Sequence, residues 1–399
     1  MPAIQVKPGI HWIGVNDRTT DLFEGLWPIT QEGVSYNSYL VASDKTALID
    51  LTKIGKEGAL LEQIQDVIGD RPLDYVVVNH MEPDHTGAIA LLRRLFPDVV
   101  FVGTAKTRTM LDSFYALTEN VQVVGEGDEI ALGDKTLRFV MAPFVHWPET
   151  MVTYETTEKV AFTCDAFGGF GALRGAIFDD EYEDMGFYLR EAQRYFANIL
   201  PSFAGPVLKA ITKLDDVDVS VIAPSHGLVW RKDPSRIVNL YRTWSEYGAR
   251  PAEYGITMVW GSMYGNTEAM MNAVAEGISR TGIPLEIFDA ARTHVSYMLP
   301  SLWSRRGVMI GAPTYETSLF PPVANVLDMA GHKRLRNKQV AMFGSYGWSG
   351  GARRVVEQRV EELKWQWFDA FEFNGGPTQE ELRQGEDFGE RFARSVLES

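Results

Sequence analysis

The sequence predicts a layered α/β protein of two domains, and three observations support this. Short apolar, β-branched runs alternate with segments of helical spacing along the 399 residues. The polar stretch 248–255 breaks this periodicity and precedes a fresh strand at 256–260. Histidines and carboxylates follow the strands of the first half, whereas Gly-, Ser- and Thr-rich loops follow those of the second. We therefore expect one domain at 1–250 and another at 254–399.

Composition limits the classes of function. A hydrophobic content of 45% and a charged content of 23% are typical of a globular protein. No apolar run approaches the roughly 18 residues that span a membrane, and the first residues do not resemble a signal peptide, so we expect a cytoplasmic protein. The net charge of −15 argues against nucleic-acid binding. The single cysteine, Cys164, excludes an intrachain disulfide and a four-cysteine metal site.

The first half begins with strand-like runs at 34–42 and 46–51, followed by helical spacing at 57–68. A strand is expected at 75–78, a helix at 87–96 and a strand at 99–102. The alternation of these elements predicts layers of helices on sheets.

Four metal-capable side chains follow the strand at 75–78 within six positions: His80, Glu82, Asp84 and His85. An ordinary polar loop rarely has this density of imidazole and carboxylate. The mixed nitrogen and oxygen set suits iron or manganese as well as zinc. Neighbouring residues in an extended segment point in opposite directions, so one loop could serve two metals. His80 and Glu82 would then bind one metal, and Asp84 and His85 the other.

Three further candidate ligands, His146, Asp165 and His226, each follow an apolar strand, at 137–145, 159–164 and 219–225. A single histidine after a strand is more often a hydrogen-bonded core residue. Together with the cluster at 80–85, however, the three indicate a metal site at one edge of a sheet.

The second half repeats a strand, a loop and a helix. Its first loop, Gly-Ser-Met-Tyr-Gly-Asn-Thr at 261–267, offers hydroxyls and helix N-terminal amides to an anion. It lacks the Gly-Lys-Ser/Thr ending of nucleoside-triphosphate loops, which favours a bound mononucleotide. Similar loops follow the strands at 307–312 and 338–343, where Tyr315, Tyr346 and Trp348 could bracket a flat ring or pack on their own loops. The candidate cofactor-binding residues are Ser262, Met263, Tyr264, Gly265, Asn266, Thr267, Pro313, Thr314, Tyr315, Ser345, Tyr346, Gly347, Trp348, Ser349 and Gly350.

The stretch His80-Met-Glu-Pro-Asp-His85 resembles the His-x-His-x-Asp-His motif of the metallo-β-lactamase fold, with Glu82 at the second histidine position as in its diiron branch. Ser262-Met-Tyr-Gly-Asn-Thr267 resembles the flavodoxin phosphate loop. In this order the two are similar to flavodiiron proteins, also called A-type flavoproteins, over essentially the whole chain. The resemblance implies an αββα metallo-β-lactamase-like sandwich followed by a doubly wound, parallel-sheet flavodoxin-like domain.

The resemblance also implies a diiron centre and an FMN. His80, Glu82 and His146 would hold the iron nearer the flavin. Asp84, His85 and His226 would hold the other iron, with Asp165 bridging the two. Many members have Phe-His-Gly where this chain has Phe23-Glu-Gly25, which makes Glu24 a candidate catalytic residue. Tyr195 is a candidate proton or electron donor, or else an aromatic on a helix core face.

The family reduces O2 to water, NO to N2O, or both. Its electron donor is rubredoxin, or a reduced deazaflavin in some members, and its head-to-tail homodimer can pair into a dimer of dimers. We expect Arg353 and Arg354, with Arg334, Arg336 and Lys338, to form a basic patch for an acidic donor; the alternative is a solvated helix face. Two other functions stay open: a zinc hydrolase fused to an FMN module, and a flavin electron carrier or sensor with a vestigial metal site.

Overall fold

The computed structural model describes residues 2–399, which fall into two compact units that divide after residue 243. The division lies within helix α7 (Pro234–Glu246), and the polar stretch 248–255 follows that helix. None of the helices among the described residues is long and apolar enough to cross a membrane.

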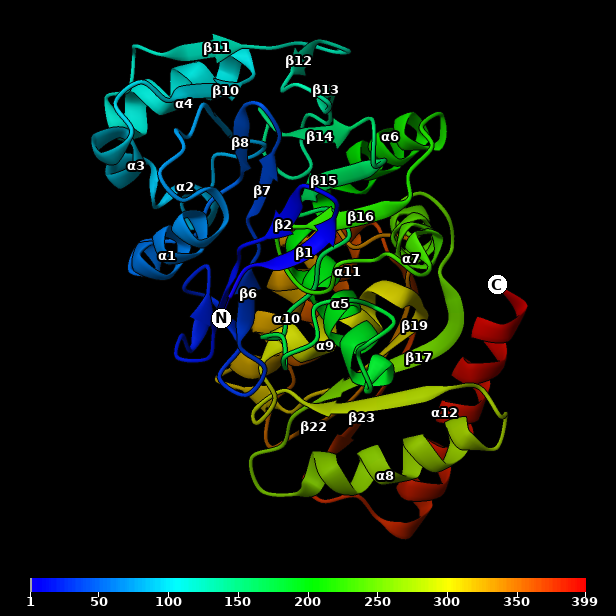
Figure 1. The fold of residues 1–399 in the computed structure, drawn as a ribbon. Helices are drawn as coiled ribbons and strands as arrows, with labels where there is room; N and C mark the ends of the chain where they lie inside the picture. The colour runs from blue at the N-terminus through cyan, green and yellow to red at the C-terminus, as the bar shows by residue number, and fades with distance from the viewer. Residues whose placement is uncertain (1) are drawn as a thin grey trace. The chain divides into compact units, whose positions relative to one another are not determined.

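The first unit contains two large β-sheets (Figure 1). The seven-stranded sheet has the order β1-β2-β7-β8-β9-β10-β11, and the five-stranded sheet has the order β12-β13-β14-β15-β16. The strands of the larger sheet are β1 Ile4–Lys7, β2 Ile10–Trp12, β7 Tyr39–Ala42, β8 Thr46–Ile49, β9 Tyr75–Val77, β10 Val100–Gly103 and β11 Val121–Val123. Those of the smaller sheet are β12 Glu129–Ala131, β13 Thr136–Met141, β14 Met151–Glu155, β15 Val160–Cys164 and β16 Val221–Pro224. The short pairs are β3 Val15–Asp17 with β6 Val34–Tyr36 and β4 Leu22–Phe23 with β5 Trp27–Pro28.

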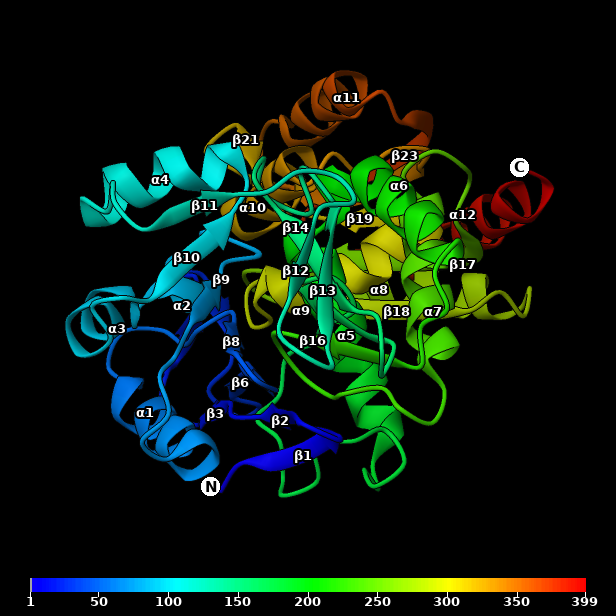
Figure 2. The ribbon, with the colours of Figure 1, turned by 45° about the horizontal axis from the view of Figure 1, so that its top comes forward.

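Helices cover the outer faces of these sheets (Figure 2). Leu60 and Ile64 of α1 and Leu92 of α3 share a buried apolar cluster with Val76 and Phe101 of the larger sheet. The helices are α1 Glu57–Ile68, α2 Pro83–Thr86, α3 Ile89–Leu95, α4 Ala105–Tyr115, α5 Met185–Ile199, α6 Ala204–Asp215 and α7, with a 3-10 turn at Pro201–Phe203. The predicted αββα sandwich is confirmed.

Two predicted elements are interrupted where they meet the site. The strand expected at 34–42 breaks after Tyr36, because the buried Asn37 side chain bridges other segments. Its Nδ2 donates to the carbonyls of Pro224 and Gly227 at 2.8 and 2.9 Å. The helix expected at 87–96 starts at Ile89, and a separate turn, α2, lies within the ligand stretch itself, with Pro83 at its first position.

The second unit is a five-stranded parallel sheet in the order β18-β17-β19-β22-β23. Met258, Met309 and Phe343 on one face pack against α8 and α12, while Thr257 on the other face hydrogen-bonds to Ser301 of α9. Helices on both faces confirm the doubly wound fold. Its elements are β17 Glu253–Trp260, α8 Asn266–Ser279, β18 Leu285–Asp289, α9 Val295–Ser304, β19 Arg305–Gly311, β20 Thr314–Tyr315, β21 Ser318–Leu319, α10 Pro321–His332, β22 Gln339–Tyr346, α11 Ala352–Leu363, β23 Gln366–Asn374 and α12 Gln379–Glu398.

Candidate metal centre

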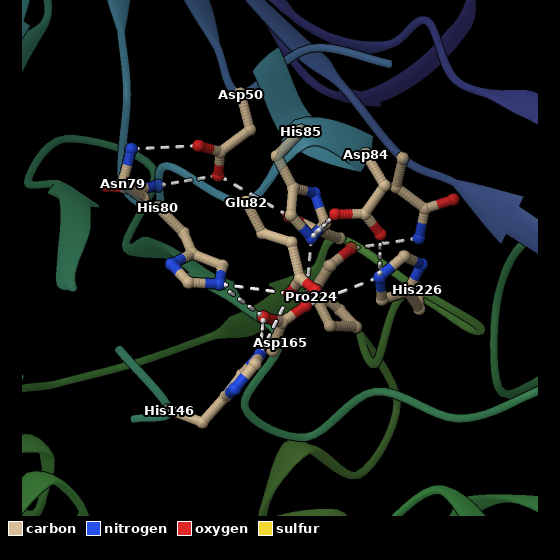
Figure 3. A network of polar contacts seen from close by, with 12 residues as sticks. Asp50, Asn79, His80, Glu82, Asp84, His85, His146, Asp165, Pro224 and His226 are labelled. Carbon is tan, nitrogen blue, oxygen red and sulfur yellow. Dashed lines mark hydrogen bonds and ion pairs between the residues drawn. The ribbon is translucent and has the colours of Figure 1, made fainter. Parts of the chain in front are cut away.

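The structure brings all seven predicted ligands of the first unit together (Figure 3). The segment after β9, which includes α2, carries four of them. The remaining three come from the loop before β14 and from the ends of β15 and β16. They fall into two groups of ligand atoms, each within 4.8 Å of one another: His80, Glu82, His146 and Asp165, and then Asp84, His85 and His226.

Asp165 lies between the two groups. Its Oδ2 is 3.3 Å from Nε2 of both His80 and His146. Its Oδ1 is 3.0 Å from Nε2 of His85 and 3.3 Å from Nε2 of His226. One carboxylate therefore presents one oxygen to each group, which is the geometry of a bridging ligand.

The carboxylates and imidazoles of the cluster shift one another's pKa values. Burial alone would lower the pKa of His146, but hydrogen bonds to Asp165 and Glu82 raise it to about 9. Burial likewise opposes protonation of His226, but Asp165 and Asp84 raise its pKa to about 10. Burial would raise the pKa of Glu82, but its bonds to His146 and His80 hold that pKa well below its usual range. The carboxylates thus create a strongly negative potential that positive charge must offset.

Several buried ligand atoms have no partner outside the cluster and no hydrogen bond of regular geometry: both carboxylate oxygens of Asp84, Oδ2 of Asp165 and Nε2 of His226. Their contacts are ion pairs at 3.3 Å with other residues of the cluster. Buried polar atoms are normally satisfied, so this concentration fits metal cations. Cys164 lies beside the cluster, but burial and the charge of Asp165 raise the pKa of its thiol well above the usual range. The nitrogen and oxygen set therefore fits iron, manganese or zinc without a thiolate.

Two residues that we did not predict from the sequence, Asp50 and Glu149, fix the segment that carries the candidate ligands through hydrogen bonds. Asp50 accepts hydrogen bonds from the backbone N–H and the Nδ2 of Asn79, at 2.8 and 3.0 Å, just before His80. Asp50 follows its own strand β8, as the ligands do, so its position was a signal that the sequence offered. Glu149, three residues after His146, accepts from His80 Nδ1 at 2.9 Å.

A pocket of about 320 Å³ opens onto the ligand loop. Glu82 and Asp84 line it and have side chains that are 14% and 16% exposed, the most open of the seven. Glu24 also lines it, and its Oε2 accepts a hydrogen bond from Trp27 Nε1 at 2.8 Å. Tyr195 is instead buried, with its ring 5.6 Å from that of His226. Burial and the charge of Asp165 raise its pKa, so the phenol keeps its proton.

The buried Asp17 joins two segments of the pocket wall. Lys53 Nζ lies 2.7 Å from its Oδ2, and Lys56 Nζ lies 3.2 Å from its Oδ1. Thr20 Oγ1 donates to Oδ2 at 2.6 Å, and Thr19 donates to Oδ1 through both its backbone N–H and its hydroxyl. Burial would raise the pKa of Asp17, but these bonds hold it far below its usual range.

Asp17→Asn should destabilise the first unit by about 2 kcal/mol at pH 7, because it removes a charge-assisted network. The folded pKa is depressed, so this contribution is present above the unfolded pKa of about 4 and is lost as pH falls below it. Denaturant unfolding of variant and wild type between pH 3 and 7 checks this. Asp21→Asn, at a neighbouring exposed position, is the control. If the difference in free energy of unfolding between wild type and Asp17→Asn stayed constant down to pH 3, the ionised Asp17 would not be its source.

In the second unit, the predicted cofactor loops lie at the carboxyl ends of β17, β19 and β22. Ser262 Oγ accepts from the backbone N–H of Gly265, and the hydroxyls of Thr267 and Ser345 lie 3.0 Å apart, which ties the first loop to the third. Tyr264 and Trp348 are 92% and 95% exposed, so they do not pack on their own loops. Helix N-terminal amides, hydroxyls and free aromatic faces together fit a flavin mononucleotide.

The predicted basic patch is wrong in part. Arg334, Arg336 and Lys338 precede β22, whereas Arg353 follows it, and a strand of eight residues separates their positions by about 26 Å. Lys338 is also buried, with Nζ donating to the carbonyls of Trp303 and Arg305. Only Arg353 and Arg354 lie beside the predicted cofactor loops.

Fold and cluster together define a metallo-β-lactamase-like domain with a paired carboxylate–histidine site, joined to a flavodoxin domain. Residues 34–227 match the ODP family beta lactamase model, and residues 258–389 match flavodoxin. The chain is 33% identical to a nitric oxide reductase of Moorella thermoacetica, over 96% of this chain and 95% of that protein. It also superposes on rubredoxin oxygen:oxidoreductase from Desulfovibrio gigas (TM-score 0.93, 28% identity, 99% of each chain). A flavodiiron protein from Giardia intestinalis gives a TM-score of 0.93, 27% identity and coverage of 100% and 97%. The chain belongs to the flavodiiron protein family.

Proposed function

We propose that this protein reduces O2 to water, NO to N2O, or both, at a non-haem diiron centre fed by FMN. The observation that carries the proposal is the position of Asp165, with one oxygen facing each of two histidine–carboxylate groups. Such a site suits a small diatomic substrate, because two metals held close together could both contact it.

The seven candidate ligands would be shared between two irons. His80, Glu82 and His146 would hold one iron, Asp84, His85 and His226 would hold the other, and Asp165 would bridge the two. When bound, the reduced iron pair and the reduced flavin supply two electrons each, which together match the four that O2 reduction consumes; two NO molecules consume two. The loops of the second unit would hold the FMN phosphate at the N-terminus of α8 and its ring against Tyr264, Tyr315 and Trp348.

The chain's remaining task is to deliver protons. Glu24 stands on the wall of the pocket that reaches Glu82 and Asp84, where its carboxylate would relay protons from solvent. Tyr195 would hold a proton at its phenol oxygen on the buried side of His226. These two positions flank the cluster from its open and its closed side.

The electron donor would be a separate small redox protein such as rubredoxin, or a reduced deazaflavin. The solved relative from Desulfovibrio gigas, whose name includes rubredoxin, supports the first. Arg353 and Arg354 are where an acidic donor would dock. A head-to-tail homodimer, which can pair further, and a cytoplasmic location complete the proposal.

Anaerobic stopped-flow mixing tests the function. The fully reduced protein is mixed with O2 and with NO in turn, and flavin reoxidation is followed together with the products. We expect rapid flavin oxidation by at least one gas, with water rather than peroxide from O2, or N2O from NO. The proposal would be refuted if the flavin of the reduced, metal-loaded protein were reoxidised by both gases no faster than free reduced FMN.

A further inference from the structure

The two halves of the cluster are supported differently by the atoms behind the ligands. His80 Nδ1 donates to the Oε1 of Glu149 at 2.9 Å, and both side chains are fully buried. His226 Nδ1 donates instead to the carbonyl oxygen of Ser35 at 2.7 Å. His85 Nδ1 is buried without a hydrogen bond. Among the hydrogen bonds of the described residues, the group containing His80 therefore has an anionic acceptor behind a ligand, whereas the other group has a neutral one.

Glu149 is itself fixed. Its Oε1 also accepts the backbone N–H of Met81 at 2.9 Å, and Thr104 Oγ1 donates to its carbonyl at 3.3 Å. Its bond to His80 sets the tautomer, because a proton on Nδ1 leaves the Nε2 lone pair directed at Glu82 and Asp165. An imidazole that donates to a carboxylate becomes a more basic ligand than one that donates to a carbonyl.

Within residues 2–399, no buried carboxylate other than Glu149 hydrogen-bonds to a ligand imidazole from behind, although the charge of Asp50 acts on His85. Asp50 lies close to His85, but its oxygens receive the hydrogen bonds of Asn79 and, at 3.4 Å, of Ser225. None of these hydrogen bonds reaches a ligand imidazole. Thr150 Oγ1 lies 3.4 Å from His80 Nδ1, but it is neutral and donates to the carbonyl of Trp147.

We propose that Glu149 is a positioning residue that makes the metal position of His80, Glu82 and His146 the tighter of the two. The metal at the Asp84, His85 and His226 position is then the first to be lost to a chelator. This inference rests on the proposed diiron centre, and it adds an order of metal retention that is built into the chain.

Glu149→Gln separates charge from geometry. The amide oxygen can still accept from His80 Nδ1 and Met81, but the negative charge is gone. We expect about tenfold faster release from the His80 position, in line with the usual cost of changing a partner behind a metal ligand. Glu155→Gln is the matched control, since Glu155 is also fully buried and accepts backbone N–H groups, from Thr157 and Glu158, at the far end of β14.

The iron-loaded wild type, Glu149→Gln and Glu155→Gln are incubated with excess EDTA. Iron release is timed, and anomalous diffraction gives the occupancy of each position part-way through. In the wild type, the His85 and His226 position should empty first; in Glu149→Gln alone, the His80 position should empty as fast or faster. If the wild type loses the His80 metal first, or Glu149→Gln releases iron as Glu155→Gln does, the inference is wrong.

The order of metal release in the wild type and its metal content are also informative. If Glu149→Gln does not fold, the order of release in the wild type still decides the proposal. If the loaded wild type never holds a second metal, the diiron proposal fails, whereas two metals released in the opposite order overturn only the role of Glu149.

Discussion

Asp165→Ala should reduce the metal content from about two per chain to one or fewer and lower gas reduction by at least about 100-fold. Changing a partner behind a ligand typically costs 10- to 100-fold in affinity or activity, and Asp165 is itself the residue that touches both groups. Its removal also leaves the four histidines without their shared anion. Flavin content should stay at the wild-type level, because the predicted FMN loops belong to the other unit.

Metal analysis, flavin absorbance and the stopped-flow assay measure this result. Asp179→Ala is the control: Asp179 accepts the backbone N–H groups of residues 231–233 but is not a ligand, so its loss should affect stability and leave the metals bound. An Asp165→Ala protein with full gas-reducing activity would support the flavin-carrier hypothesis instead.

Gly277→Val should destabilise the second unit by about 3 kcal/mol, because α8 and α12 approach closely at glycines. A Cβ on Gly277 would lie 1.8 Å from the carbonyl oxygen of Glu386, and one on Gly389 would lie 2.2 Å from that of Val274. These are backbone atoms, so relief requires the helices to separate. The buried cluster of Met270, Val274, Phe388 and Phe392 would then open.

Thermal unfolding followed by flavin fluorescence checks this prediction, and we expect FMN release well below the wild-type temperature. Glu276→Val places the same β-branched side chain at the preceding, exposed position of α8, so it controls for helix propensity. Equal losses in the two variants would mean that the close helix contact contributes little.

The clustering of the seven candidate ligands was predictable because they follow apolar runs, and neighbouring strands bring their ends together. The sequence could not supply the contacts that support them. Glu149 reads as an ordinary residue of a loop until β14 sets it behind His80. Asn37 read as part of a strand, since nothing nearby indicates that its amide binds the loop of His226. Both roles depend on partners far away in the chain.

In the second unit, the sequence predicted a surface role for a charged residue that the structure buries. The charge of Lys338 predicts a surface position beside the arginines, but Lys338 is buried. Its amine donates hydrogen bonds to two carbonyls near the end of α9. Burial lowers the pKa of its amine to about 7. Charge alone does not indicate which end of a strand a residue occupies, whereas the order of the elements does.

The most direct test of a diiron centre fed by FMN is the metal and flavin content of the protein purified without added metal. We expect about two irons and about one FMN per chain, with little zinc. Two zincs per chain, once misloading during expression was excluded, would contradict this expectation and favour a hydrolase joined to a flavin module. FMN with no metal would contradict it equally and favour an electron carrier.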